Sequence, residues 1–212
     1  MRVLCVVMGL LALSPCARCG PITNMPGLSF DTLDATAIAG TSFNWIAIPF
    51  TVAVTEKLQS ILVPLEYGTG PNTMTFSIYS GTTTHPTTTL LETLTVTNVP
   101  RSAPTMETLN SVTHPTLNPG TTYFLVQKQT SNSTAMNWYD NNIGQTGYYT
   151  TFNGSTWFDE TGSFFTTPAY EINFQSSAPE PATFLCVIPP AGLVLIRRRF
   201  IQKSARYASA LQ

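Results

Sequence analysis

The chain has 212 residues, of which 43% are hydrophobic and 10% are charged, and its formal net charge is −1. Residues 21–178 hold ten acidic and three basic side chains, so this part carries a net charge near −7. Nucleic-acid binding needs clustered lysine and arginine, and this acidic balance excludes it as an expected function. About 155 residues between the terminal segments suffice for one domain with a sizeable core.

The four cysteines lie at the two ends of the chain: Cys5, Cys16, Cys19 and Cys186. Residues 20–181 contain none, so no disulfide can form inside the predicted domain, although export would permit one. The stability of that domain must therefore come from the burial of side chains.

Residues 1–20 predict a secretory signal peptide. Arg2 is followed by the apolar run 3–13, and small residues follow Pro15. A basic start, an apolar segment of about 11 residues and a small-residue exit are typical of such peptides. The run is too short to cross a bilayer, which needs about 20 residues. A buried N-terminal strand is the alternative interpretation, and cleavage after Cys16 or after Cys19 fits the exit.

Residues 21–176 are predicted to form one exported domain. Apolar and polar residues alternate there, and long runs with the helical period are absent. In the segment 73–80, Met74, Phe76 and Ile78 share one face, as in a half-buried antiparallel strand. The segments that we expect to be strands are 43–54, 58–67, 73–80, 90–98, 121–129, 147–152, 155–158 and 170–175. The segments 107–112 and 136–139 are left open as short additional strands.

Turn-forming residues separate these segments. The sequence 117–120 predicts a turn, since proline fits its second position and glycine supplies positive φ at the third. Asn153-Gly154 is typical of a tight hairpin. Pro49 and Pro64 lack an N–H group and are expected at sheet edges or bulges. The pattern predicts an all-β fold, a single β-sandwich or jelly roll of about eight or nine antiparallel strands.

Residues 177–212 form a composite terminal segment. It consists of a Pro-Glu-Pro tripeptide, an apolar run and an arginine cluster: Pro179, Glu180 and Pro181, then 182–196, then Arg197, Arg198 and Arg199. We expect a short hydrophobic helix over the apolar run, with the basic tail on the cytoplasmic flank. The short run and its Pro189-Pro190 break favour a transient anchor over a permanent transmembrane helix.

This composite resembles the PEP-CTERM sorting signal of Gram-negative bacteria. The resemblance implies that an exosortase, a membrane-embedded cysteine-dependent transpeptidase, recognises Pro179, Glu180 and Pro181 and cleaves nearby. These residues are then the recognition motif of a substrate and not a catalytic site. The resemblance also implies export, a transient stay at the inner membrane, and a final location at the cell surface or outside the cell.

The body of the chain resembles the exported choice-of-anchor β domains that often precede such signals. The matching segments are 45–47, 49–52, 58–65, 75–79 and 117–126, together with the hairpin that contains Asn153, Gly154 and Trp157. The resemblance covers about two-thirds of the chain, a share typical of a single domain. It implies an all-β fold and brings no catalytic residues.

We find no convergent set of catalytic side chains. His85 and His114 each precede proline in threonine-rich loops, without the spacing of metal ligands, and are interpreted as solvated. No serine lies in the nucleophile motif Gly-x-Ser-x-Gly. Asp31 and Asp34 could bind Ca²⁺ weakly, but a solvated turn is favoured. We therefore expect a non-enzymatic protein with no metal site and no cofactor.

Carboxylate pairs leave a glycoside hydrolase as a weaker alternative, because such enzymes need two carboxyl groups that flank the reacting bond. Asp159 and Glu160 are adjacent, so on a strand they point to opposite faces. Asp140 and Glu171 could meet only through the tertiary structure.

Aromatic residues beside Asp and Asn suggest a carbohydrate-binding module, with an exopolysaccharide as its ligand. An aromatic ring stacks on the C–H groups of a sugar while polar side chains bond its hydroxyls. The candidates are Trp138, Tyr139, Asp140 and Trp157. The alternative is that both tryptophans pack in the core, where Trp45 is also expected. The leading hypothesis remains a non-enzymatic surface or matrix protein, exported and sorted by an exosortase.

Overall fold

In the computed structural model, every described residue belongs to the unit that ends at Gln175. The described residues are 20–38, 45–82, 84–131, 133–151, 155–160, 162 and 165–175. The predicted signal peptide, apart from Gly20, and the whole PEP segment lie outside them, as does Asn153-Gly154. Within the described part of the chain, no helix is long and apolar enough to cross a membrane.

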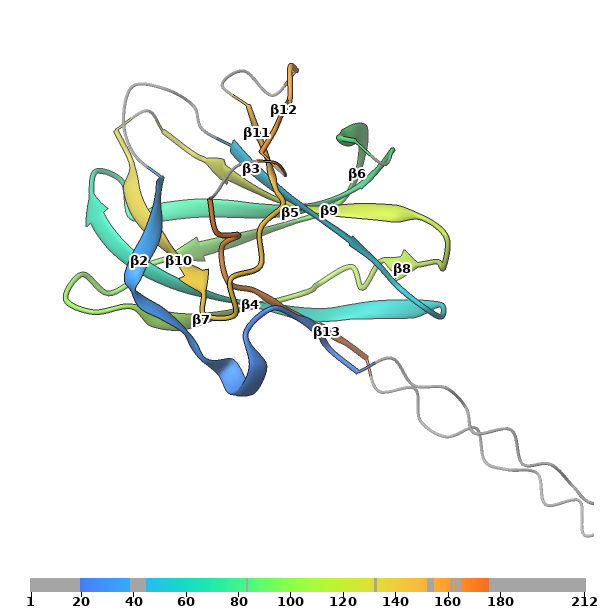
Figure 1. The fold of residues 1–212 in the computed structure, drawn as a ribbon, viewed down its shortest axis with the longest axis horizontal. Helices are drawn as coiled ribbons and strands as arrows, with labels where there is room; N and C mark the ends of the chain where they lie inside the picture. Colours follow the sequence, from blue (N-terminus) through green and yellow to red (C-terminus); the bar gives the residue numbers. More distant parts are fainter. Residues whose placement is uncertain are drawn as a thin grey trace, which may run out of the picture. The chain divides into compact units, whose positions relative to one another are not determined.

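The described residues form two antiparallel sheets, drawn as facing layers in Figure 1. The first sheet contains β1 (Ile22–Thr23), β2 (Phe30–Ile38), β4 (Glu56–Thr69), β7 (Thr105–Asn110), β8 (Thr116–Leu117), β10 (Ala135–Asn141) and β13 (Glu171–Phe174). The second contains β3 (Trp45–Thr51), β5 (Thr73–Gly81), β6 (Pro86–Thr97), β9 (Thr122–Gln129), β11 (Tyr149–Thr151) and β12 (Phe158–Asp159). A short 3₁₀ turn, η1 (Pro26–Leu28), is the one helical element among them. The all-β prediction is confirmed, and the two sheets are consistent with a β-sandwich.

The long strand β4 organises the first sheet. On one side it pairs with β13 and then with β10, which continues to the edge strand β2. On its other side it pairs with β7 and β8. The second sheet has the order β12-β11-β3-β9-β5-β6, so β9 lies near its centre.

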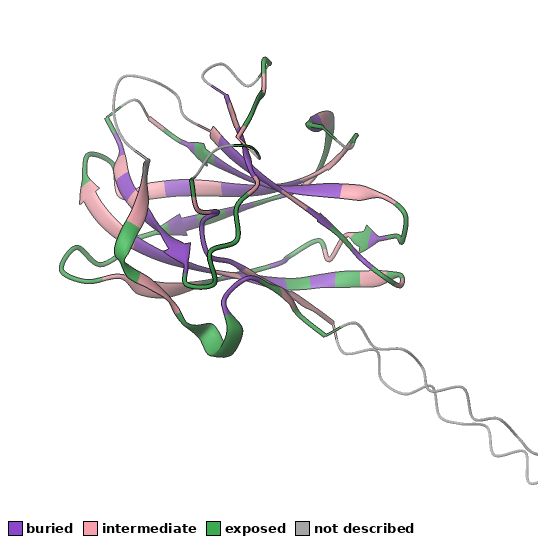
Figure 2. Cartoon of the chain, in the orientation of Figure 1, coloured by how far each residue is buried: buried purple, intermediate pink, exposed green. Residues whose placement is uncertain are grey.

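The core fills the space between the two sheets. As predicted, Met74, Phe76 and Ile78 of β5 are fully buried on one face, and Figure 2 shows buried residues along the strands of both sheets. Buried and exposed positions alternate along residues 92–97 of β6, whereas residues 123–127 of β9 are all buried. Trp138 of β10 is also fully buried, and its ring meets that of Phe76 edge to face, with centroids 5.0 Å apart. The indole N–H of Trp138 donates to the Ala169 carbonyl at 2.8 Å, so the buried donor is satisfied.

A buried carboxylate connects the two sheets at one margin. Glu92 of β6 accepts hydrogen bonds from the Ser111 hydroxyl and from the backbone N–H groups of Val112 and Thr113, which follow β7. Burial disfavours the charged form of Glu92, but these hydrogen bonds outweigh it and lower its pKa below the ordinary value.

Pro49 and Pro64 lie inside the sheets, at positions where the neighbouring strand on one side is absent. Pro64 of β4 pairs with Met106 on one side, and on the other it falls in the gap between the last partner of β13 and the first of β10. Pro49 of β3 pairs with Phe124, and β11 does not extend to it. Pro49 and Pro64 were expected at sheet edges or bulges, and neither lies on an edge strand. Each instead lies where a neighbouring strand leaves one side of the backbone without a partner, so the missing N–H group costs no ladder hydrogen bond.

The strand β2 was not predicted from the sequence, which favoured a turn around Asp31 and Asp34. This strand pairs on one side only, and it lacks an alternating apolar face. Leu33 is 96% exposed, and its N–H is bonded to the Asp31 carboxylate at 2.8 Å. Backbone pairing with β10 thus defines this strand, and the alternation of hydrophobic and polar residues in the sequence could not reveal it.

Gly70 offers a test of the close contact between two turns. It has φ +82°, and a Cβ atom there would lie 1.9 Å from the Ser133 carbonyl oxygen, whereas Gly120, with φ +77°, has open space around it. Gly120→Ala is expected to cost about 1–2 kcal/mol of unfolding free energy from backbone strain alone. Gly70→Ala should cost about 1–3 kcal/mol more, because backbone atoms must also move. Equal losses in denaturant unfolding would contradict this packing.

Candidate functional site

The structure separates the four residues that were candidates for carbohydrate binding. Trp138 is in the core and presents no ring face to solvent. Tyr139 is buried, donates its hydroxyl to Glu66 and packs against Phe30. Asp140 lines one pocket, whereas Trp157 lines another, at the second sheet. Of the four, Trp157 is the one whose ring lines either of these two pockets.

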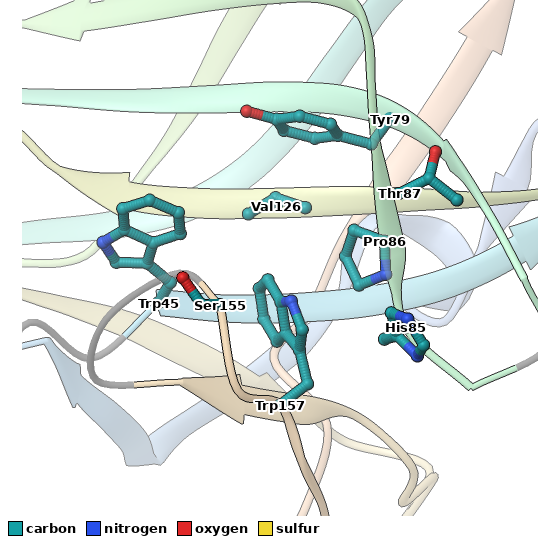
Figure 3. A pocket seen from close by; sticks show the side chains of 8 residues that line it. All are labelled: Trp45, Tyr79, His85, Pro86, Thr87, Val126, Ser155 and Trp157. Carbon is teal, nitrogen blue, oxygen red and sulfur yellow. The ribbon is translucent and has the colours of Figure 1, made fainter.

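The pocket beside Trp157 has a volume of about 680 Å³ and is lined mainly by rings. Its described lining residues are Trp45, Tyr79, His85, Pro86, Thr87, Val126, Ser155 and Trp157. Figure 3 shows the side chains of Trp45, Tyr79 and Trp157 arranged around that of Val126, with Pro86 and His85 along the remaining side. We call this space the aromatic pocket.

Strand alternation places the aromatic pocket on the outer face of the second sheet. In β3, Ile46 and Ile48 point into the core, so Trp45 and Ala47 face outward. In β9, Val126 likewise faces outward between core residues. A small second cluster forms there from buried Ala47, Phe124, Val126 and Tyr149, with Trp45, Tyr79 and Trp157 packed against it.

The expectation that Trp45 is a core residue is therefore wrong. Its ring is half-buried on the outer face, and the ammonium group of Lys128 lies 4.4 Å from the ring centroid, within cation–π range. The indole N–H of Trp45 is buried and has no hydrogen-bond partner among the described residues. Such an orphaned donor costs about 1–3 kcal/mol, so the ring is held by packing and by the cation.

A second, acidic pocket of about 340 Å³ lies in the first sheet near the junction of β2 and β10. Its lining includes Asp34, Thr36, Asp140 and Tyr148. Asp140 is 5% exposed and accepts a hydrogen bond from the Thr36 hydroxyl at 3.0 Å. Burial raises the pKa of Asp140 to about 6, with a further contribution from the charges of Asp34 and Asp31, against the opposing effect of that hydrogen bond.

The tyrosine of the acidic pocket is also shifted. Burial raises the pKa of Tyr148 to about 12, and the neighbouring carboxylates Glu160 and Asp140 add to the effect. The pocket therefore holds uncharged hydroxyl groups beside a carboxyl group that is protonated in mild acid.

The other polar candidates lie elsewhere. Glu171 is on β13, where it accepts a hydrogen bond from Asn173, and it does not line the acidic pocket. His85 lines the aromatic pocket. His114 is only half exposed, has φ +48°, and its Nδ1 lies 2.9 Å from the Leu58 carbonyl oxygen, so the interpretation of a solvated loop residue is wrong for it. Among the described residues, no three His, Cys, Asp or Glu side chains are grouped to hold a metal ion.

Sequence reasoning missed Tyr79 and Lys128 as members of a site. For Tyr79 the sequence did contain the relevant information, because alternate residues of a strand point to opposite faces. Tyr79 is an odd number of positions from Met74, Phe76 and Ile78, so it faces away from the core. No protein-family model, curated protein or solved structure matches this chain.

Asp140 predicts an unusual pH dependence of stability. Its pKa is higher in the folded than in the unfolded protein, so the folded state is favoured when Asp140 is protonated, and stability is lost as pH rises from about 4 to 6. Asp140→Asn keeps the acceptor for Thr36 and removes this loss. The variant should gain up to about 3 kcal/mol relative to wild type at pH 7 and little at pH 4.

Denaturant unfolding at both pH values measures this difference. Asp34→Asn removes a neighbouring negative charge that raises the pKa of Asp140. In this variant the pH-dependent loss of stability should therefore occur at lower pH than in wild type. If the difference in unfolding free energy between wild type and Asp140→Asn stays constant from pH 4 to 7, folding does not raise the pKa of Asp140 and the prediction is wrong.

Proposed function

We propose that this chain is a non-enzymatic, exported cell-surface or extracellular-matrix protein of a Gram-negative bacterium. The observation that carries the proposal is the pair of terminal signals, 1–20 and 177–212, around an acidic domain without cysteine. An all-β unit of two sheets supports it, because such a unit can be stable on burial alone. A jelly roll is the finer form of this fold that we propose.

The two ends have separate roles in this proposal. The signal peptide directs export, and the apolar run 182–196 forms a short helix that holds the protein transiently in the inner membrane. The basic residues Arg197, Arg198 and Arg199 stay on the cytoplasmic side. An exosortase-like transpeptidase then recognises Pro179, Glu180 and Pro181 and cleaves nearby, which releases or transfers the domain.

Intact-mass measurement of a tagged protein, expressed in an exosortase-bearing host, tests this route. The material outside the cell should lack an N-terminal piece of about 20 residues and the segment that follows the motif. Replacement of Glu180 by alanine should leave the C-terminal segment attached and the protein in the membrane fraction. A matched control, Glu171→Ala, should be processed normally. Cytoplasmic protein with both ends intact would contradict the proposal.

A carbohydrate-binding function is the second candidate, and the aromatic pocket favours it. Three rings from separate segments, Trp45, Tyr79 and Trp157, line a space large enough for a sugar residue. Their faces can stack on the C–H groups of a pyranose, and the Thr87 hydroxyl or the His85 ring can bond its hydroxyls. The ligand would be an exopolysaccharide of the matrix into which the protein is delivered.

Hydrolysis is less well supported than binding. The described lining of the aromatic pocket includes no carboxylate, and the acidic pocket brings Asp140 together with Asp34 and not with Glu171 or Asp159. A glycosidase needs an acid and a second carboxylate on either side of the reacting bond. A glycoside hydrolase therefore stays the weakest of the three candidates.

Ring deletions test the carbohydrate function. Trp157→Ala and Tyr79→Ala should each weaken binding to exopolysaccharide about tenfold, as measured by affinity electrophoresis, because a stacking face is lost. Trp138→Phe, a change inside the core, and Phe158→Ala, beside the pocket lining, are the controls, and both should bind normally when folded. Unchanged binding by both ring variants would exclude the pocket as the sugar site.

A further inference from the structure

Beside the aromatic pocket, the outer face of the second sheet carries three pairs of hydroxyl side chains. The pairs face each other across β5 and β6: Thr73 and Thr97, Thr75 and Thr95, and Ser77 and Thr93. We call these six residues the hydroxyl ladder. They face outward because their neighbours along each strand, such as Phe76 and Leu94, are buried in the core.

The hydroxyl ladder has a regular spacing, and its β6 side is exposed. Paired side chains in an antiparallel sheet stand about 5 Å apart, and successive rungs are about 7 Å apart along the strand. The Ser77 and Thr93 hydroxyls are 2.9 Å apart, and the Thr75 hydroxyl donates to the Lys128 carbonyl at 3.0 Å. The three threonines on β6 are exposed, so this surface presents both donors and acceptors to solvent.

Lys128 connects the ladder to the aromatic pocket. The strands β5, β9 and β3 are neighbours in the second sheet (Figure 1). Thr75 pairs with Lys128, and the Lys128 ammonium lies over the Trp45 ring. The register of these strands places Ser77, Val126 and Ala47 in one row, and Val126 is part of the pocket lining. The pocket and the ladder are therefore adjacent parts of one sheet face, with the Lys128 ammonium between them.

The charge of this face differs from that of the domain. Lys128 is one of three basic residues in 21–178, against ten acidic ones. The hydroxyl ladder contains no acidic residue, and the Lys128 ammonium lies over the Trp45 ring. Asp159 of β12 pairs with Tyr149 of the second cluster, two residues after the pocket residue Trp157, so an acidic residue also lies on this face beside the pocket.

From this arrangement we infer that the pocket and the ladder together bind a linear polysaccharide that carries carboxylate groups, such as a polyuronate. This inference rests on the carbohydrate-binding function proposed above. One sugar ring stacks in the aromatic pocket, a neighbouring carboxylate pairs with Lys128, and the following sugar hydroxyls bond to the ladder. The cation selects the acidic polymer, and the ladder makes affinity increase with chain length.

The test compares polygalacturonate with the same polymer after its carboxyl groups have been reduced to hydroxymethyl groups. Wild-type protein should bind the acidic polymer about fivefold more tightly, and high salt should remove the preference. Lys128→Gln should bind both polymers equally, and Lys128→Arg should restore the preference. Lys57→Gln, which removes a cation from the other sheet, is the matched control and should behave as wild type.

Chain length tests the ladder separately. The double variant Thr75→Val and Thr95→Val should bind a monosaccharide or disaccharide as wild type does, and lose the gain in affinity for longer oligomers. Thr108→Val on β7 of the other sheet is the control for loss of a strand threonine. Circular dichroism and thermal unfolding of each variant establish that the fold is retained.

The outcomes distinguish this inference from the function on which it rests. If Trp157→Ala removes binding to both polymers while Lys128→Gln keeps the acidic preference, the pocket binds sugar and the inferred selectivity is wrong. If wild-type protein binds neither polymer, the carbohydrate function and this inference fail together. Binding only of the reduced polymer, or a preference insensitive to salt, would also overturn the role of Lys128.

Discussion

The contact between Trp138 and Phe76 shows the constraint on which the fold depends. Residues 20–181 contain no cysteine, so the two sheets are held together by side chains that pack between them. Trp138 and Phe76, which meet edge to face, are among the largest of these buried side chains. The indole N–H is satisfied by Ala169, so the ring adds apolar burial without an unpaired donor. The Glu92 carboxylate adds a polar connection at one margin.

The same alternation that fills the core also creates the outer face. Each residue that points inward from β3, β5 or β9 sets the direction of its neighbours, so Trp45, Tyr79 and Val126 must lie on the outer face of the sheet. Trp157 then packs over them from the segment before β12 and closes a pocket. The pocket on the outer face of this sheet is thus a direct consequence of core packing, and Lys128 beside it stands out against an acidic domain.

The sequence predicted the well-alternating strands, and it did so because period two is a local property. The segments now seen as β4, β5 and β9 were anticipated closely. β5 has the alternation of a half-buried strand, and β9 is rich in aromatic and β-branched residues, although it is buried on both faces. The edge strand β2 was not, because pairing with β10 and not burial defines it. Nor could the neighbourhood of Asp140 and Asp34 be read locally, since it joins strands about 100 residues apart in the chain.

By itself, the sequence determined the all-β class, the absence of disulfides from the domain, and the composite motifs at both ends that suggest export and sorting. Only the tertiary structure decided which tryptophan is which: Trp138 is buried in the core, whereas Trp45 and Trp157 line a pocket. The physical reason is that a strand's pattern shows two faces, but the packing of one sheet on the other selects the face that meets solvent.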